Sequence, residues 1–238
     1  MTRMRKFLGV FDFDHTIIQD NSDIVVRDLL SGSIISQQTK NLAETGRWTA
    51  YMRDIFGLLH KQEISEEVIR KAIVEIPPVP YFLLFLHKLK EMDCDTIIIS
   101  DANTYFIDEW LKSNNVKICI DAIYTNPAEF INGKLDISEY HFQDWCSQSG
   151  INLCKGYVME KHIEDQRKLG IEYGTVFYVG DGQNDLCPSL KLRENDLLFP
   201  RIGYPLLDLI KSSKEIKALV TPWATTNDIF TTLQAVKS

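Results

Sequence analysis

Three short apolar runs along the chain have the pattern of strands that are buried on both faces. They cover residues 7–13, 96–100 (TIIIS) and 175–180 (TVFYVG), and each is rich in β-branched or aromatic residues. Apolar positions with helical spacing lie between them, at residues 81–91, 104–112 and 155–169. Strands that alternate with helices predict an α/β fold, a doubly wound parallel sheet with helices on both faces.

The segment from residue 21 to residue 80 departs from this alternation. It contains helix-like pieces at 23–30, 48–59 and 65–73 but no apolar run of the buried-strand kind. It ends in IPPVP (76–80), which cannot continue a helix. We therefore expect a helical cap at residues 21–80, inserted after the first strand of a core domain made of residues 1–20 and 81–238. A small hairpin is also predicted at Asn132-Gly133, which lies between apolar residues.

Each predicted strand ends in a polar turn that carries aspartate. The three turns are DFDHT, SDANT and GDGQND. Ligands of open parallel sheets bind beyond the carboxyl ends of the strands, where these turns should meet. The pattern therefore predicts one site that contains Asp12, Asp14, Ser100, Asp181 and Asp185, with Lys155 at the start of the helix that leads into the third strand.

The residue types in this site suit phosphoryl chemistry. Asp12 and Asp14 are two apart on an extended segment, so their like charges share one face and repel. Mg²⁺ prefers oxygen ligands, and Asp12 and Asp181 can supply the carboxylates that would hold it with a substrate phosphate. The Ser100 hydroxyl and the Lys155 ammonium can donate to phosphate oxygens. One aspartate can attack phosphorus, and a second can protonate the leaving oxygen and then activate water.

Taken together, DFDHT (12–16), Ser100, Lys155 and GDGQND (180–185) resemble the four motifs of the haloacid dehalogenase-like phosphohydrolases. A narrower resemblance, to the phosphocholine/phosphoethanolamine phosphatase family that includes pyridoxal phosphate phosphatases, rests on DNSD (20–23), SDANT (100–104), NLCKG (152–156) and CPSLKL (187–192). The resemblance spans nearly the whole chain. It implies a Rossmann-like core with a helical cap over the site.

The resemblance also implies roles for individual residues. Asp12 would be the nucleophile and Asp14 the general acid/base. Mg²⁺ would be bound by Asp12, the main-chain carbonyl of Asp14 and Asp181, with Asp185 behind these ligands. The segment CKGYVMEKH (154–162) favours Lys155 over Lys161 as the lysine of the third motif.

Two acids, Asp23 and Asp101, are not used by this core mechanism. One interpretation is that each caps a helix, since NSDIVV and SDAN both have the pattern of a helix start. The other is that both face the leaving group, where paired carboxylates would suit a cationic head such as ethanolamine or choline, or the polar groups of pyridoxal. The resemblance favours the second, because these positions match substrate-contacting acids. In the predicted cap, Trp48, Tyr51 and Phe56 have core spacing, and one of them could line the pocket.

The net charge and the apolar runs of the chain limit the kinds of partner that the protein is expected to bind. The formal charge of −7 over 238 residues argues against a general binder of nucleic acid or anionic membranes. No apolar run approaches the roughly 20 residues that cross a bilayer, and an acidic pair interrupts the first apolar stretch too early for a signal peptide. We expect a cytoplasmic protein with a small-molecule phosphoester as its partner. The oligomeric state is left open.

Five cysteines without repeating spacing argue against a disulfide framework. His141, Cys146 and Cys154 lie close enough in sequence to suggest zinc, but C-x-x-C ligand pairs are missing. Reduced thiols are therefore the preferred interpretation. The segment YHFQDWCSQSGINLC (140–154) also carries fewer Cys and His residues than the same segment does in the family that the chain resembles. The role of this segment is therefore left open.

The sequence as a whole predicts a Mg²⁺-dependent phosphomonoesterase that acts through a phospho-aspartyl intermediate. Its substrate would be a small phosphorylated metabolite, either pyridoxal 5′-phosphate or phosphoethanolamine/phosphocholine. Two alternatives remain at this point. A receiver-like signalling switch would store the aspartyl phosphate, and a non-catalytic protein of the same fold would only bind.

Overall fold

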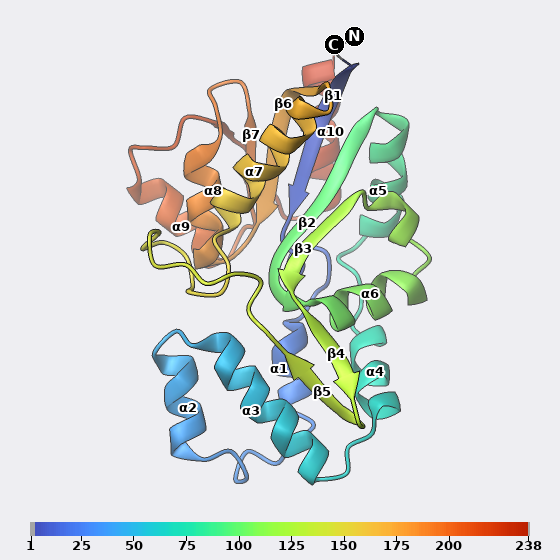
Figure 1. Ribbon diagram of the computed structural model, residues 1–238. Helices are drawn as coiled ribbons and strands as arrows, with labels where there is room; N and C mark the ends of the chain where they lie inside the picture. Colours follow the sequence, from blue (N-terminus) through green and yellow to red (C-terminus); the bar gives the residue numbers. More distant parts are fainter. Residues whose placement is uncertain (1–2, 238) are drawn as a thin grey trace.

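A six-stranded sheet forms the centre of the computed structural model, which describes residues 3–237 (Figure 1). Every neighbouring pair of strands is parallel, so all the carboxyl ends reach the same edge. The strands follow the order β3-β2-β1-β6-β7-β8. They are β1 (Arg3–Phe11), β2 (Cys94–Asn103), β3 (Ala122–Asn126), β6 (Ile171–Gly180), β7 (Leu197–Pro200) and β8 (Leu219–Val220).

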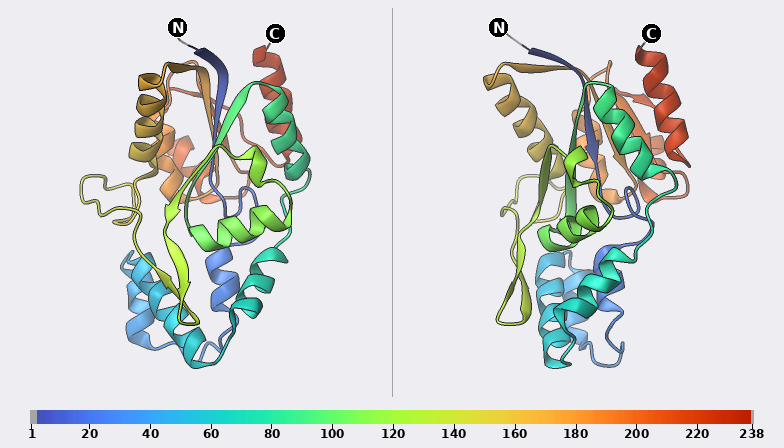
Figure 2. Two further views of the ribbon diagram at one scale, coloured as in Figure 1. Left: turned by 45° about the vertical axis from the view of Figure 1, so that its right-hand side comes forward. Right: turned by 90° about the vertical axis from the view of Figure 1, so that its right-hand side faces the viewer.

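Helices cover both faces of this sheet, as the alternating pattern predicts (Figure 2). Side chains alternate along β1, so Phe7 and Phe11 enter one core cluster while Leu8 and Val10 enter the other. The first cluster lies under α5 (Phe82–Glu91), α6 (Thr104–Ser113) and α10 (Thr226–Lys237). The second lies under α7 (Lys155–Lys168), α8 (Leu186–Lys191) and α9 (Pro205–Ser212). The doubly wound α/β prediction is confirmed.

Four helices are inserted between β1 and α5 and form a layer at the carboxyl edge of the sheet (Figure 1). The chain enters and leaves this layer side by side, because Gln19 N donates to Pro77 O (3.0 Å) and Val79 N donates to Ile17 O (2.9 Å). The inserted helices are α1 (Ser22–Arg27), α2 (Gln37–Glu44), α3 (Trp48–Lys61) and α4 (Glu66–Val74).

A two-stranded hairpin, β4 (Ala128–Ile131) and β5 (Lys134–Ile137), packs beside α3. Its turn residues Asn132 and Gly133 have φ of 51° and 80°, the left-handed backbone that an Asn-Gly turn provides, and this prediction is confirmed. The Arg53 guanidinium of α3 donates to Ile137 O at 2.9 and 3.1 Å. We propose that the cap consists of residues 21–80 together with this hairpin.

The structure differs from the sequence-based expectation at several elements. The first strand ends at Phe11, two residues earlier than predicted. Phe13 N donates to Asp12 Oδ1 (2.7 Å), and His15 adopts a positive φ of 52°, which an extended strand does not have. The elements that were not predicted are helices α2, α8, α9 and α10, the short 3₁₀ turns Lys117–Cys119 and Gln183–Asp185, and the short strands β3, β7 and β8. Among residues 3–237, no helix is long and apolar enough to cross a membrane.

Candidate active site

An acidic cavity of about 240 Å³ lies where the ends of β1, β2 and β6 face the cap. Its walls carry six of the eight residues that the sequence predicts for the site, namely Asp12, Asp14, Asp23, Ser100, Asp101 and Asp181. The Ser100 hydroxyl is buried and accepts from Ala102 N (3.2 Å). The other two, Lys155 and Asp185, are fully buried, and Lys155 contacts both Asp12 and Asp185.

Lys155 joins two of the predicted acids within the core. Its ammonium nitrogen lies 2.6 Å from Asp12 Oδ2 and 2.7 Å from Asp185 Oδ1. Burial alone would lower the pKa of Lys155, but the charges of Asp12 and Asp185 outweigh it and raise that pKa above its usual value. Lys155 is therefore a fixed positive charge at the floor of the site. Lys161, by contrast, is exposed and pairs with Asp165 on the outer face of α7.

Asp185 connects Lys155 to the GDGQND loop. Its Oδ1 accepts from Lys155 and from the Tyr178 hydroxyl (2.6 Å), and its Oδ2 accepts from the main-chain N–H groups of Asp181 and Gly182 (both 2.9 Å). The Asp185 carboxylate therefore accepts four hydrogen bonds. Asp185 is thus arranged to orient the loop and Lys155.

Asp12 and Asp181 have the properties expected of ligands for a hard cation. Oxygens of Asp12, Asp181 and Asp185 lie within 4.8 Å of one another. Burial raises the pKa of Asp12 to about 7, against the opposing charge of Lys155. Burial and then the charge of Asp12 raise the pKa of Asp181 to about 8. A divalent cation would offset this repulsion, so the buried oxygens fit Mg²⁺.

Asp14 connects the site to the cap. Its Oδ1 accepts from Ser22 N (2.8 Å), at the first residue of α1. Burial, followed by the charge of Asp23, raises the pKa of Asp14 well above its usual value. A raised pKa favours the protonated form of this carboxyl, which is the form that can act as a general acid.

The helix-capping interpretation of Asp23 is wrong. Asn21 caps α1 by accepting from Ile24 N (3.0 Å), whereas the Asp23 side chain turns toward the cavity. Asp23 Oδ2 accepts from Trp48 Nε1 (2.6 Å), while the buried Oδ1 has no partner within residues 3–237. Burial is the main reason that the pKa of Asp23 is raised to about 7. Trp48 is therefore the cap aromatic that lines the pocket.

The capping interpretation of Asp101 is wrong as well. Asn103 caps α6 by accepting from Phe106 N (3.0 Å). Asp101 instead accepts from Asn152 Nδ2 (2.9 Å) and Asn184 Nδ2 (2.5 Å), which fix its carboxylate at the cavity wall. Sequence reasoning did not foresee these two amides, although both lie within segments that the motifs cover, NLCKG and GDGQND.

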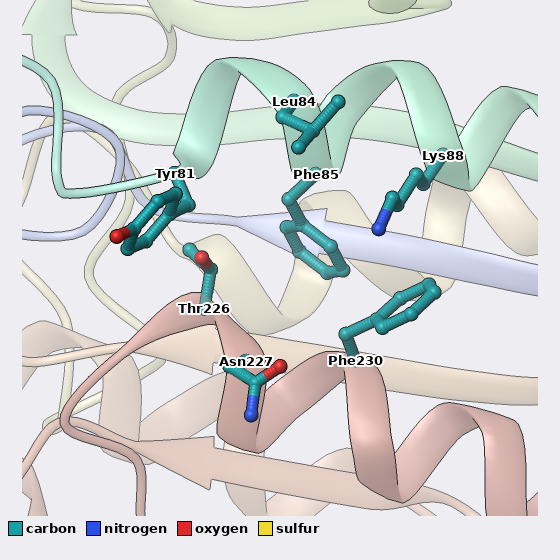
Figure 3. Close-up of a pocket in the computed structure, with 7 residues that line it drawn as sticks. All are labelled: Tyr81, Leu84, Phe85, Lys88, Thr226, Asn227 and Phe230. Carbon is teal, nitrogen blue, oxygen red and sulfur yellow. The ribbon is translucent and has the colours of Figure 1, made fainter.

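A second cavity, between α5 and α10, has different chemistry (Figure 3). Lys88 is the one charged group among its seven lining residues, and its ammonium lies 4.4 Å from the centre of the Phe230 ring. This cavity has no carboxylate among those lining residues, and none of them belongs to the turns that follow β1, β2 and β6. The acidic cavity is therefore the candidate active site.

Comparison with known proteins agrees with this geometry. The family model described as Putative Phosphatase matches residues 7–237. The probable phosphatase phospho2 of Xenopus tropicalis is 38% identical over 233 residues, covering 96% of this chain and 98% of the relative. The chain belongs to this family of phosphatases.

Two further relatives of this phosphatase carry substrate names. The pyridoxal phosphate phosphatase PHOSPHO2 of Bos taurus is 34% identical, covering 96% of this chain and 98% of the relative. The human phosphoethanolamine/phosphocholine phosphatase is 31% identical, covering 97% and 89%. The phosphatase also shares its fold with a solved phosphoserine phosphatase in a phospho-aspartyl intermediate analogue form, at a TM-score of 0.65, 18% identity and coverage of 96% and 99%.

Proposed function

We propose that this phosphatase hydrolyses a small phosphomonoester, either pyridoxal 5′-phosphate or phosphoethanolamine/phosphocholine, with Mg²⁺ and through phosphorylated Asp12. The observation that carries the proposal is the buried Asp12–Lys155–Asp185 cluster, with Asp181 beside it, on the floor of the cavity under the cap. It supplies a nucleophile, a fixed cation and carboxylates for a metal in one small volume.

In the first step a carboxylate oxygen of Asp12 attacks phosphorus, and the bond from phosphorus to the leaving oxygen breaks. Asp14 gives its proton to that oxygen. In the second step Asp14 takes a proton from water, whose oxygen attacks phosphorus and releases phosphate from Asp12. Lys155 and the Ser100 hydroxyl bind the phosphoryl oxygens throughout.

Mg²⁺ would be held by Asp12, Asp181 and the main-chain carbonyl of Asp14, and when bound it supplies positive charge that neutralises the phosphoryl group. Asp185 would act behind these ligands by fixing Lys155 and the loop that carries Asp181.

Asp23 and Asp101 are proposed to bind the leaving group. Both line the cavity, and Asp23 Oδ1 is a buried acceptor without a partner among the described residues. Two carboxylates beside an anionic phosphate favour a substrate whose leaving group is cationic or rich in hydrogen-bond donors. The substrate names of the two relatives agree with this chemistry.

A panel of small phosphoesters tests the proposal. We expect turnover of pyridoxal phosphate or phosphoethanolamine with Mg²⁺, and loss of turnover in Asp12→Asn. Asp23→Asn and Asp101→Asn should each raise KM for phosphoethanolamine by about tenfold, the effect of losing roughly 1.4 kcal/mol of binding. Asp20→Asn is the matched control, because Asp20 is exposed.

Two outcomes would contradict parts of this proposal. An unchanged KM in Asp23→Asn and Asp101→Asn would remove the leaving-group role of these acids. A persistent aspartyl phosphate without turnover on any panel member would favour the signalling switch, although the family is one of phosphatases.

A further inference from the structure

Three cysteines from two distant parts of the chain meet beside the active site. Cys146 and Cys154 belong to the irregular segment between β5 and α7, yellow in Figure 1, and Cys187 is the second residue of α8. Cys187 Sγ lies 3.4 Å from Cys146 Sγ and 3.7 Å from Cys154 Sγ. All three sulfur atoms lie within 4.8 Å of one another.

These spacings are those of a tetrahedral metal centre. Thiolates at about 2.3 Å from zinc have sulfur atoms about 3.8 Å apart. A disulfide would need one pair at about 2.05 Å and would leave the third sulfur unused. Cys154 and Cys187 are buried and Cys146 is half-buried, so the cluster is closed on most sides.

The surrounding segment holds the cysteines in place without help from an ion. The buried Gln143 amide donates to the carbonyls of Cys146 (3.2 Å), Ser149 (3.1 Å) and Gly150 (2.7 Å). The Gln143 Oε1 accepts from Cys146 N (2.9 Å), which closes the loop on itself. The position of Cys146 is therefore fixed by the protein's own hydrogen bonds, and binding requires little reorganisation.

Gly156 leaves room for the Cys187 side chain in the cluster. A Cβ at this position would lie 2.6 Å from Cys187 Sγ, closer than real contacts allow. The absence of a side chain at the start of α7 lets Cys187 approach Cys154. Close approach of this kind is a recurrent use of glycine.

We propose that Cys146, Cys154 and Cys187 bind a thiophilic divalent cation, Zn²⁺, as three thiolates. Each thiol passes its proton to solvent as its sulfur ligates the ion. The fourth position would take an oxygen, from water or from the Ser149 hydroxyl, which lies 3.4 Å from Cys146 Sγ. Cys154 directly precedes Lys155, and Cys187 follows Asp185 by two residues. The ion would therefore join the two segments that supply the buried Lys155–Asp185 pair.

Sequence spacing favours reduced thiols because the chain contains no C-x-x-C pair. Cys187 is 33 residues from Cys154, so sequence spacing does not reveal it as the third ligand. Ser149 occupies the position that would complete C-x-x-C with Cys146. The Ser149→Cys variant should therefore contain four thiolates around the same point.

Cobalt titration of the reduced, full-length protein, freed of zinc and supplied with Mg²⁺, tests the proposal, because Co²⁺ reports its ligands spectroscopically. We expect one equivalent of Co²⁺ to produce a thiolate-to-cobalt charge-transfer band with intense tetrahedral visible bands, and Zn²⁺ to displace it. Zinc content of protein purified without chelator should approach one ion per chain. Ser149→Cys should tighten binding by an order of magnitude or more, roughly the advantage of a fourth thiolate.

Single variants separate this cluster from the other cysteines. Cys146→Ser should abolish the charge-transfer band, whereas Cys119→Ser should retain it, because Cys119 lies apart from the cluster at 3.5 Å from His87 Nδ1. The wild-type titration does not depend on the variants folding. The proposal is overturned if wild-type protein shows no thiolate band and retains no zinc. It is equally overturned if the intact mass of metal-free protein reveals a disulfide within the cluster.

Discussion

Lys155 donates a 2.6 Å hydrogen bond to Asp12 from a position where 1% of its side-chain surface is exposed. A buried ammonium between two carboxylates keeps its charge, and here it lies against the residue proposed as the nucleophile. The same contact therefore contributes both to the stability of the core and to the chemistry of the site.

Lys155→Met should harm both properties. Removal of the ammonium leaves Asp12 and Asp185 buried without their cation, so the free energy of unfolding should fall by about 3–5 kcal/mol. Phosphatase activity should fall by roughly 100-fold or more, since a fixed charge on the phosphoryl oxygens is lost. Denaturant unfolding and steady-state kinetics measure the two effects. Lys161→Met, on the exposed face of the same helix, is the control and should leave both unchanged.

Asp23 should make substrate affinity depend on pH. Its pKa of about 7 means that the carboxylate is charged above neutral pH and protonated below it. If it binds an ammonium, the ratio of KM for phosphoethanolamine to KM for ethyl phosphate should fall as the pH rises through about 7. Ethyl phosphate lacks the ammonium but shares the phosphate titration. A ratio that stays flat in wild-type protein would argue against the charge pairing, and Asp23→Asn should make it flat.

Asp23→Asn should also stabilise the protein at higher pH. The folded pKa of about 7 lies above the ordinary value of 3.8, so the native state holds the proton more strongly than the unfolded chain does. The stability that this provides is present at low pH and is lost as the pH rises through about 7. The melting temperature of Asp23→Asn relative to wild type should therefore increase between pH 4 and pH 7, the range set by these two pKa values. A melting-temperature difference that stays constant across that range would contradict a raised pKa for the buried, partly unpaired carboxyl of Asp23.

Mg²⁺ should stabilise the folded protein through Asp12 and Asp181. Ligand at 100 times its dissociation constant adds about 2.7 kcal/mol to the free energy of unfolding. Adding Mg²⁺ to dialysed protein, without a chelator that would also remove thiolate-bound ions, should raise the melting temperature. Asp181→Asn should reduce that rise. An equal rise in Asp181→Asn would place the cation elsewhere.

Much of the fold could be predicted from the sequence because its central strands are buried on both faces. Runs such as TVFYVG have few polar residues, and each ends in an aspartate turn that marks the carboxyl edge. The outer strands lack this signal. β7 has four residues and β8 two, too few for any periodicity to emerge.

The site could be predicted in outline but not in its supporting contacts. The catalytic residues lie in local motifs, whereas the partners that fix them come from distant segments. Asn152 and Asn184 approach Asp101 from positions 51 and 83 residues away, and Cys187 meets Cys146 across 41. Such contacts depend on the packing of α7 and α8, which sequence patterns do not specify.

Trapping of the phosphorylated enzyme tests the central claim most directly. Wild-type protein with Mg²⁺ and a ³²P-labelled substrate is quenched in acid during turnover, and the labelled peptide is identified by mass spectrometry. We predict an alkali-labile phosphoryl group on Asp12 that is absent from Asp12→Asn. Turnover without label on Asp12, or activity retained in Asp12→Asn, would contradict the account.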